Sequence, residues 1–270
     1  FPKAYAALMP AVYMPIGFML TALIFRGVAF EFRFKASGSS RRIWDQAFHW
    51  GSVVATFAQG LVLGTLVHGI ALEDGRFAGG MFDWLTPFSF VTGCALVWGY
   101  ALLGSGWLVI KTNGPLQDWA RRTGVISALV VAAMMVLVSL WVPTLDAVAA
   151  DRWGLRYPDV DWSRLLPLTP IPLLTAFAFW RLVKGFRGNA VYGPYLWSVA
   201  LFLLGYVGLL VGIFPNLVPY GLTIHQAAAA PNSQALLLVG ALVMLPIILG
   251  YTAYVYWVFR SKVEADAGYH

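Results

Sequence analysis

Long apolar runs alternate with short polar segments along almost the whole chain of 270 residues. A helix that crosses the hydrocarbon layer of a bilayer needs about 20 mainly apolar residues. Runs of that length predict seven spans, which lie at about residues 5–26, 46–70, 84–110, 122–145, 165–183, 194–214 and 234–259. Since neither an internal repeat nor a low-complexity tract divides them, we expect one all-α integral membrane domain over residues 1–270.

The fifth run is the least regular, because it contains the segment LLPLTPIPLL with Pro167, Pro170 and Pro172. A proline removes one backbone hydrogen bond from a helix, and its ring crowds the preceding turn. We therefore expect the outer end of this span to be unwound or distorted. In the second run, Gly60 and Gly64 lie four residues apart and would permit a close contact between helices.

The composition also indicates that the solvent of this chain is a lipid bilayer. Hydrophobic residues make up 60% of it and charged residues 11%, whereas soluble domains carry roughly 25% charged residues. The net charge of +6 does not indicate nucleic acid, because the cations first have to be placed relative to the spans. The single cysteine, Cys94, excludes an internal disulfide and is interpreted as a small apolar filler.

Lysine and arginine are distributed unevenly between the two sides of the membrane that seven spans define. The side reached after the first, third, fifth and seventh spans carries Arg26, Arg33, Lys35, Arg41, Arg42, Lys111, Arg121, Arg122, Arg181, Lys184, Arg187, Arg260 and Lys262. The other side carries only Lys3, Arg76, Arg152, Arg156 and Arg164. By the positive-inside rule, the first side faces the cytoplasm, and the C-terminus lies there too.

The three outer connections differ in character. Residues 71–83 are short and acidic, and residues 146–164 combine four Asp and three Arg with aromatic residues that suit a membrane interface. Residues 215–233 contain no Lys, Arg, Asp or Glu. We expect such a long uncharged segment to be covered by protein or to lie at the interface.

All twelve carboxylates lie outside the spans or at their margins. They are Glu31, Asp45, Glu73, Asp74, Asp83, Asp118, Asp146, Asp151, Asp159, Asp161, Glu264 and Asp266. A proton- or cation-coupled carrier keeps a costly ionisable group near the middle of the membrane. This distribution weakens a secondary transporter as the alternative function, although the proline-rich fifth span supports it. The sequence also lacks GxxxxGK[ST], HExxH, CxxC and GxSxG, so we expect neither a catalytic residue nor a metal site in this chain.

The four histidines do not form an obvious pair of haem ligands. His49 and His68 lie at opposite ends of the second run, nineteen residues apart, which corresponds to about 28 Å along a helix. His225 lies in an outer loop and His270 in the C-terminal tail. A cytochrome in its own right is therefore the weakest alternative, and the chain has the features of a membrane scaffold for a catalytic partner.

Several stretches resemble subunit II of the cytochrome bd-type quinol oxidases. The first is RGVAFEFR at 26–33, whose form is closer to the cyanide-insensitive branch of that family than to the enterobacterial type. The others are FPKAYA at the start, WDQAFHWGS at 44–52, GIFPNLVPYGLTIHQAAAAPNSQ at 212–234 and LPIILGYTAYVYWVFRSKV at 245–263. The chain begins where the family's second helix passes to its third, so the resemblance implies the last seven helices of a nine-helix subunit built from four-helix bundles, without its N-terminal pair.

The resemblance also implies a function. The chain would be the non-haem subunit of a terminal respiratory oxidase in the bacterial inner membrane, paired with a subunit I that holds haems b558, b595 and d and oxidises quinol. This chain itself would bind no haem. Whether the quinol is ubiquinol or menaquinol, and whether a structural quinone, a lipid or a small accessory subunit binds here, stays open.

In this family, protons are thought to reach the oxygen-reducing haem along a polar path at the subunit boundary. The positions that match the family's inner-face groups are Arg26 and Glu31. An aspartate that the family carries in a WDGNE-like segment has no counterpart in this sequence. Five residues place the two side chains about 140° apart on a straight helix, so they would share a face only if the helix ends near Gly27. The alternative interpretation gives these charged residues a structural role only, as anchors of the membrane topology and as a salt bridge in a loop.

Overall fold

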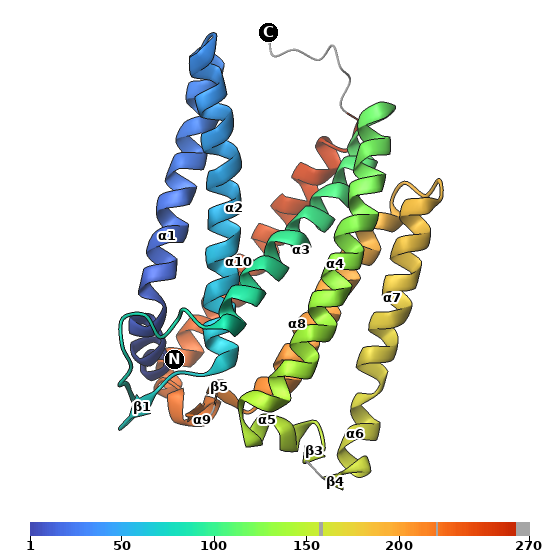
Figure 1. The fold of residues 1–270 in the computed structure, drawn as a ribbon. Coiled ribbons are helices and arrows are strands. Elements are labelled where there is room, and N and C mark those ends of the chain that lie inside the picture. The colour runs from blue at the N-terminus through green and yellow to red at the C-terminus, as the bar shows by residue number, and fades with distance from the viewer. Residues whose placement is uncertain (157–158, 220, 263–270) are drawn as a thin grey trace.

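The computed structural model describes residues 1–156, 159–219 and 221–262, and most of these are helical (Figure 1). Within these ranges, seven helical segments are long and apolar enough to cross a membrane. They are α1 (Pro2–Lys35), α2 (Ser39–His68), α3 (Pro87–Lys111), α4 (Pro115–Leu145), α6 (Trp162–Leu168) with α7 (Pro170–Arg187), α8 (Gly193–Ile213) and α10 (Pro231–Val258). The prediction of an all-α membrane protein with seven spans is confirmed.

Successive spans run in opposite directions, so their connections gather at two ends of the molecule (Figure 1). One end carries the α1–α2, α3–α4 and α7–α8 turns and the end of α10, and we call it the cationic end. The opposite end, the loop end, carries the short elements. These are α5 (Ala147–Arg152), α9 (Ile224–Ala227) and three antiparallel strand pairs: β1 (Leu72–Glu73) with β2 (Arg76–Phe77), β3 (Leu155–Arg156) with β4 (Asp159–Val160), and β5 (Asn216–Val218) with β6 (Leu222–Thr223).

Helices α3, α4, α7 and α8 share one hydrophobic core. Its buried members are Leu102 and Val109 of α3, Ala120, Ala128 and Val131 of α4, Ala178, Leu182 and Phe186 of α7, and Leu201 of α8. Gly124 of α4 leaves room for the ring of Phe186, which a Cβ at that position would overlap. These four spans therefore form a four-helix bundle, the kind of unit that the family resemblance implied.

Helix α2 connects this bundle to α1, because it packs against α1 on one side and against α3 on the other. Its contact with α3 depends on glycine: a Cβ on Gly60 would lie 2.5 Å from the Cα atom of Gly93. The Thr92 hydroxyl donates a 2.9 Å hydrogen bond to the carbonyl of Gly60 across the same contact. A Cβ on Gly64 would come equally close to the Cα atom of Ser89. The close helix contact predicted from Gly60 and Gly64 is confirmed.

The fifth span is interrupted only at Thr169, whose backbone dihedrals are still helical, so the unwinding or distortion that its prolines predicted at the outer end is limited to one residue. α6 ends at Leu168, Thr169 joins the two pieces, and Pro170 begins α7. The backbone N–H of Thr169 donates to the carbonyls of Leu165 and Leu166, at 3.2 and 3.3 Å. Pro170 has no N–H to continue this ladder, and at the first position of α7 it needs none.

Helix α1 is longer than the sequence predicted. The apolar run ends at Arg26, but the helix continues through Gly27 and the whole RGVAFEFR stretch to Lys35. At 1.5 Å per residue its 34 residues measure about 51 Å, against a hydrocarbon thickness of about 30 Å. The expected loop after Arg26 is therefore helix that extends beyond the apolar layer, and α1 and α2 reach further than α3, α4 and α7 at the cationic end (Figure 1).

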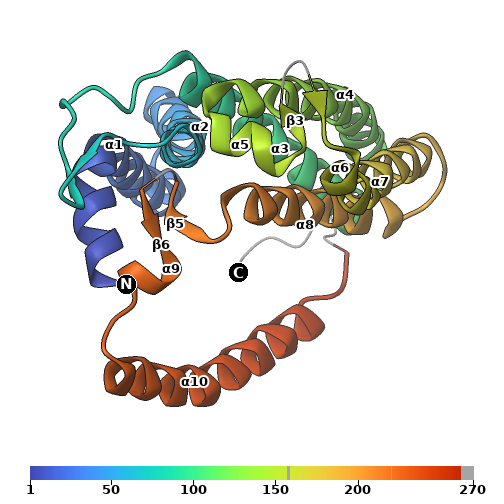
Figure 2. The ribbon, with the colours of Figure 1, turned by 90° about the horizontal axis from the view of Figure 1, so that it is seen from below.

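Helix α10 lies apart from the other spans when the molecule is viewed along them (Figure 2). None of its described residues is buried. It is attached at the cationic end, where the Lys111 ammonium at the end of α3 donates to the carbonyls of Phe259 and Ser261. At the loop end, α9 and residues 228–230 connect it to β6. Most of its apolar surface is therefore free to meet lipid or protein.

The uncharged segment 215–233 is partly covered by protein, in agreement with the sequence. Val218 of β5 and Ala227 of α9 are fully buried in a small cluster with Ala4 of α1. Leu8, Ile70 and Leu72 pack against the same cluster. The first and last outer connections therefore hold the start of α1 in place at the loop end.

Candidate functional site at the tip of the α1–α2 helical hairpin

The structure places Arg26 and Glu31 on one continuous helix. The condition for a shared face, a helix end near Gly27, is not met, since Ala29, beyond it, is fully buried and α1 continues to Lys35. Five residues on a continuous helix separate two side chains by about 140° around the axis and about 7.5 Å along it. Arg26 and Glu31 therefore do not share a face of α1.

Arg26 is positioned by α2. A Cβ on Gly51 would lie 3.1 Å from the backbone nitrogen of Arg26 and 2.8 Å from the carbonyl oxygen of Ala22, so the missing side chain lets the two helices approach. The Arg26 guanidinium lies over the ring of Phe48, 5.5 Å from its centroid. A cation over an aromatic face is attracted by about 0.5–1 kcal/mol at an exposed site. Arg26 is thus a fixed cation at the α1–α2 contact.

Glu31 has a different environment. Its side chain is exposed, and no hydrogen bond or ion pair joins it to another group within the described residues. It lies in the part of α1 that follows the apolar run, between Phe30 and Phe32, which are both exposed as well. An exposed carboxylate of this kind is free to exchange protons with water or with a neighbouring protein.

Two further contacts fix the tip of the helical hairpin, and the sequence did not predict either. The guanidinium of Arg33 on α1 forms an ion pair with the carboxylate of Asp45 on α2. The rings of Phe32 and Trp44 lie 5.0 Å apart in the same layer. Arg33 and Asp45 each stand six residues from Ser39, where α2 begins. The equal spacing of Arg33 and Asp45 on either side of the ASGSS turn could have predicted this ion pair. The spacing brings the two side chains together, however, only if the chain is helical on both sides of the turn.

The histidines lie where the sequence placed them. His49 and His68 occupy opposite ends of α2, which is one uninterrupted helix. The ring of His49 is 5.2 Å from that of Trp50, and the ring of His68 is 6.5 Å from that of Phe88. His225 is exposed on α9, and His270 lies outside the described residues. Within the described part of the chain, no three His, Cys, Asp or Glu side chains come together in a way that could hold a metal ion.

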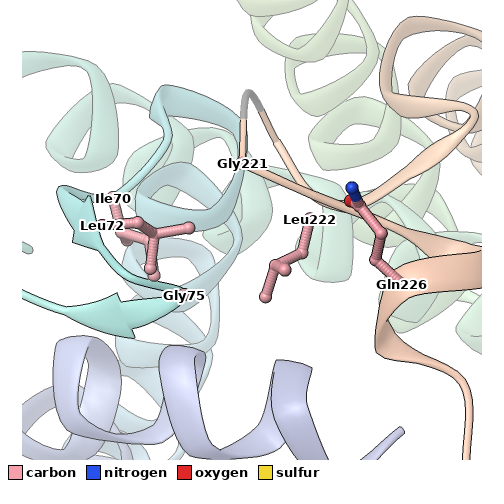
Figure 3. A pocket seen from close by; sticks show the side chains of 6 residues that line it. All are labelled: Ile70, Leu72, Gly75, Gly221, Leu222 and Gln226. Carbon is pink, nitrogen blue, oxygen red and sulfur yellow. The ribbon is translucent and has the colours of Figure 1, made fainter.

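The loop end contains a cavity of about 320 Å³ between the first and last outer connections (Figure 3). Its lining consists of Ile70, Leu72, Gly75, Gly221, Leu222 and Gln226. The amide oxygen of Gln226 accepts hydrogen bonds from the backbone N–H and hydroxyl of Thr223, at 2.9 and 3.0 Å. Because its one polar side chain already caps α9, this cavity is better suited to packing than to chemistry.

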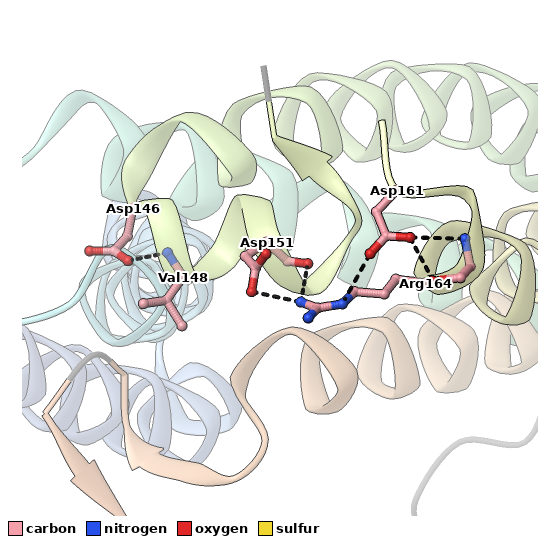
Figure 4. Close-up of polar contacts among 6 residues, drawn as sticks. Asp146, Val148, Asp151, Asp161 and Arg164 are labelled. Carbon is pink, nitrogen blue, oxygen red and sulfur yellow. Dashed lines mark hydrogen bonds and ion pairs between the residues drawn. The ribbon is translucent and has the colours of Figure 1, made fainter. Parts of the chain in front are cut away.

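Ion pairs at the same end hold the entry to the broken span (Figure 4). The Arg164 guanidinium lies 2.6 Å from a carboxylate oxygen of Asp151 and 3.3 Å from one of Asp161. Hydrogen bonds from Ser163, first from its hydroxyl and then from its backbone N–H, lower the pKa of the Asp161 carboxyl below its ordinary value. The Asp161 carboxylate therefore stabilises the folded chain at pH values above the pKa that this carboxyl has when the chain is unfolded. This stabilisation is lost as the pH falls through the lowered pKa of the folded state.

The family model for cytochrome bd terminal oxidase subunit II matches residues 1–259 of this chain. The chain belongs to the cytochrome bd terminal oxidase subunit II family. Cytochrome bd ubiquinol oxidase subunit 2 of Bacillus subtilis (strain 168) is 27% identical over 273 residues, which cover 98% of this chain and 77% of that protein. Cytochrome bd-I ubiquinol oxidase subunit 2 of Escherichia coli (strain K12) is 26% identical over 301 residues, which cover 98% of this chain and 78% of that protein.

Membership of the subunit II family defines the class of function. The chain is a subunit of a terminal oxidase, an oxidoreductase, and a multi-pass membrane protein. This favours the oxidase over the transporter alternative. A protein designated subunit II also has a partner subunit. The resemblance identified from RGVAFEFR and the later stretches is confirmed at the level of the family, and the assignment to its cyanide-insensitive branch stays a prediction.

Proposed function

We propose that this chain is the non-haem membrane subunit of a cytochrome bd-type quinol:oxygen oxidoreductase. It supports a haem-bearing subunit I in a heterodimer and contributes to the uptake of cytoplasmic protons for the reduction of O2 to water. The curated relatives, which are subunits 2 of ubiquinol oxidases, support the first part. The second part depends on one observation: Glu31 is an exposed and unpaired acid, within the described residues, on helix that extends beyond the apolar run.

The geometry supports separate roles for the two candidate residues. Glu31 takes protons from the aqueous side and passes them along polar groups and water at the boundary with the partner subunit, because hydrocarbon offers no route. Arg26, held over Phe48, supplies a cation at the α1–α2 contact on the same end of the molecule. Since the two side chains point about 140° apart, Arg26 acts as a fixed charge and is not an ion-pair partner of Glu31.

The histidines among the described residues do not form a pair of facing haem ligands. The axial ligands of a haem have to face one another at the same depth, whereas His49 and His68 lie at opposite ends of α2, about 28 Å apart. His225 lies at the loop end, as His68 does, but it is on the four-residue helix α9 of an outer connection and not on a span that faces α2. We therefore assign the haems and the oxidation of quinol to subunit I, and assign no step of electron transfer to this chain.

The partner subunit is proposed to cover α1 and α10. No described residue of α10 is buried within this chain, and its exposed side chains include Leu236, Leu242, Ile247 and Leu249. The exposed large side chains of α1 include Phe18, Ile24, Phe25 and Phe30. Tight packing between helices in a membrane gains dispersion contacts that loosely ordered lipid supplies less well. Helix α10 is the least covered of the seven spans, so it is the surface best suited to a second membrane subunit, and α1 is proposed to extend that surface.

The cationic end is proposed to face the cytoplasm of a bacterial cell, with the chain in the inner membrane. The structure gathers the α1–α2, α3–α4 and α7–α8 turns at this end (Figure 1). The helix ends that flank these turns carry most of the lysine and arginine residues, which is the distribution that the positive-inside rule associates with the cytoplasmic side. Proton uptake at Glu31 would then draw on the cytoplasm and contribute to the proton-motive force.

The substitution Glu31→Gln tests the proton role in the complete oxidase. Glutamine has nearly the same size but cannot exchange a proton at neutral pH, so we expect oxygen reduction and proton uptake to slow several-fold while the haem content is unchanged. The matched control is Glu73→Gln, an exposed glutamate in β1 at the loop end, which is expected to leave turnover unchanged. Oxygen consumption and proton uptake by the purified oxidase in vesicles measure both effects.

Natural rates of turnover and proton uptake in Glu31→Gln would contradict the proton role. Loss of haem from the complex would instead assign Glu31 to assembly. Equal slowing by Glu73→Gln would indicate a general effect of surface charge.

A further inference from the structure

We propose that the cationic end of α7 binds the phosphate headgroup of an anionic phospholipid. The site is a pocket of about 400 Å³ on the outside of the four-helix bundle, lined by Trp180, Val183, Lys184, Arg187 and Gly188. It requires only that α7 crosses a bilayer, and it is independent of the proton role of Glu31.

Two cations in this pocket lack a partner of opposite charge. Lys184 and Arg187 are exposed, and no ion pair joins either to a carboxylate within the described residues. The connection from Gly188 to Tyr192 contains no acidic residue. The Lys184 ammonium lies over the ring of Trp180, 5.4 Å from its centroid. Two adjacent unpaired cations attract a phosphate group.

The carbonyl end of α7 does not repel such an anion, because a third cation neutralises it. Arg121 of α4 donates hydrogen bonds to the carbonyls of Gly185, Gly188 and Ala190, at 3.2, 2.7 and 3.0 Å. A helix C-terminus otherwise carries about half a negative charge on its free carbonyl groups. Because Arg121 compensates this charge from within the protein, Lys184 and Arg187 remain available to a ligand outside it.

The apolar residues below the pocket favour a lipid over a free anion. Leu173, Phe177 and Trp180 are 68%, 48% and 54% exposed, and their spacing places them on one stripe of α7 with Lys184 and Arg187. The opposite face, with Leu182 and Phe186, is buried in the bundle. From Leu173 to Arg187 the stripe is about 21 Å long, which matches one leaflet of hydrocarbon, about 15 Å, and its headgroup layer.

Aromatic contacts hold the floor of the pocket in place. The ring of Phe177 lies 5.9 Å from that of Trp180 and 5.6 Å from that of Trp197 on α8. The Arg181 guanidinium lies over Trp197, 5.5 Å from its centroid, and so provides positive potential beside the pocket. Tryptophan rings at this depth are typical of the membrane interface. The acyl chains are expected to lie along Leu173 and Phe177, with the phosphate at Lys184 and Arg187.

Native mass spectrometry of the intact complex, after removal of its lipid, tests the site. The probes are phosphatidylglycerol, phosphatidylcholine and inorganic phosphate. We expect one phosphatidylglycerol to bind in preference to phosphatidylcholine, and the double variant K184Q/R187Q to bind it about tenfold more weakly. The charge-retaining variant K184R/R187K and the double variant R41Q/R42Q, which removes two exposed cations at the start of α2, should bind it as the natural chain does.

Unchanged phosphatidylglycerol binding by K184Q/R187Q would overturn the site. An equal loss in R41Q/R42Q would do the same, because it would reduce the effect to net charge. Displacement of the lipid by inorganic phosphate alone would show that the pocket binds a free anion and would overturn the lipid assignment. Comparison with K184R/R187K separates lost binding from lost folding, since that variant keeps both cations.

Discussion

At the scale of single residues, the continuous helix α1 holds the two candidate residues Arg26 and Glu31 on different faces. The apolar run ends at Arg26, and Gly27 follows as a natural place for a helix to end. A glycine inside a helix costs only about 1 kcal/mol, however, and the packing of Ala29 and Gly51 at the α1–α2 contact outweighs it. Tertiary contacts that no local pattern encodes therefore extended α1 and separated the two side chains.

The same extension brought Arg33 and Asp45 together. Both side chains are partly exposed, so we expect a coupling free energy of no more than about 1 kcal/mol between them. Unfolding of Arg33→Gln, Asp45→Asn and the double variant in detergent measures this coupling as a double-mutant cycle. A coupling of several kcal/mol, or one that salt leaves unchanged, would show that a covering partner buries the pair.

At the scale of elements, the spans were predictable because hydrocarbon imposes a minimum length of apolar helix. The break between α6 and α7 was also predictable, since Pro167 and Pro170 interrupt the backbone ladder there. The short strand pairs of the loop end were not, because two-residue strands such as β1 and β2 leave no periodic pattern in the sequence. The end of α1 beyond its apolar run was missed for a different reason, because contacts with α2 extend that helix.

The α2–α3 contact predicts that Gly→Ala substitutions at two positions change the stability of the protein in different directions. Gly60→Ala is expected to destabilise the protein by about 1–3 kcal/mol, because its Cβ would collide with the backbone of Gly93. Gly104→Ala on α3, with no neighbour within 4 Å, is expected to be neutral or to stabilise by up to about 1 kcal/mol through helix propensity. Thermal unfolding in detergent compares the two, and equal effects would contradict the proposed close contact.

At the scale of the whole molecule, the sequence predicted alternating spans and an uneven distribution of cations. It did not predict that α3, α4, α7 and α8 would share one core while α10 lies apart (Figure 2). The sequence does not distinguish the helix faces that contact protein from those that contact lipid, since the residues on both are equally apolar. Only contacts between distant residues, such as Gly124 and Phe186, distinguish the two.

The proposed orientation can be measured with single cysteines in a chain that carries Cys94→Ala. Ser40→Cys lies at the cationic end and Asp74→Cys at the loop end. In intact cells, a membrane-impermeant maleimide is expected to label Asp74→Cys only, and permeabilised cells should allow labelling of both. The reverse pattern would place the cationic end outside the cell and would remove the cytoplasmic source of protons from the proposal.

The most direct test of the central claim is the haem content of the chain with and without its partner. The tagged chain, purified from its native membrane in mild detergent, is expected to bring with it a second membrane polypeptide and a reduced-minus-oxidised haem spectrum. The same chain produced alone is expected to reach the membrane and give no haem spectrum. A haem spectrum from the chain alone, or oxidase activity without a haem-bearing companion, would contradict the account.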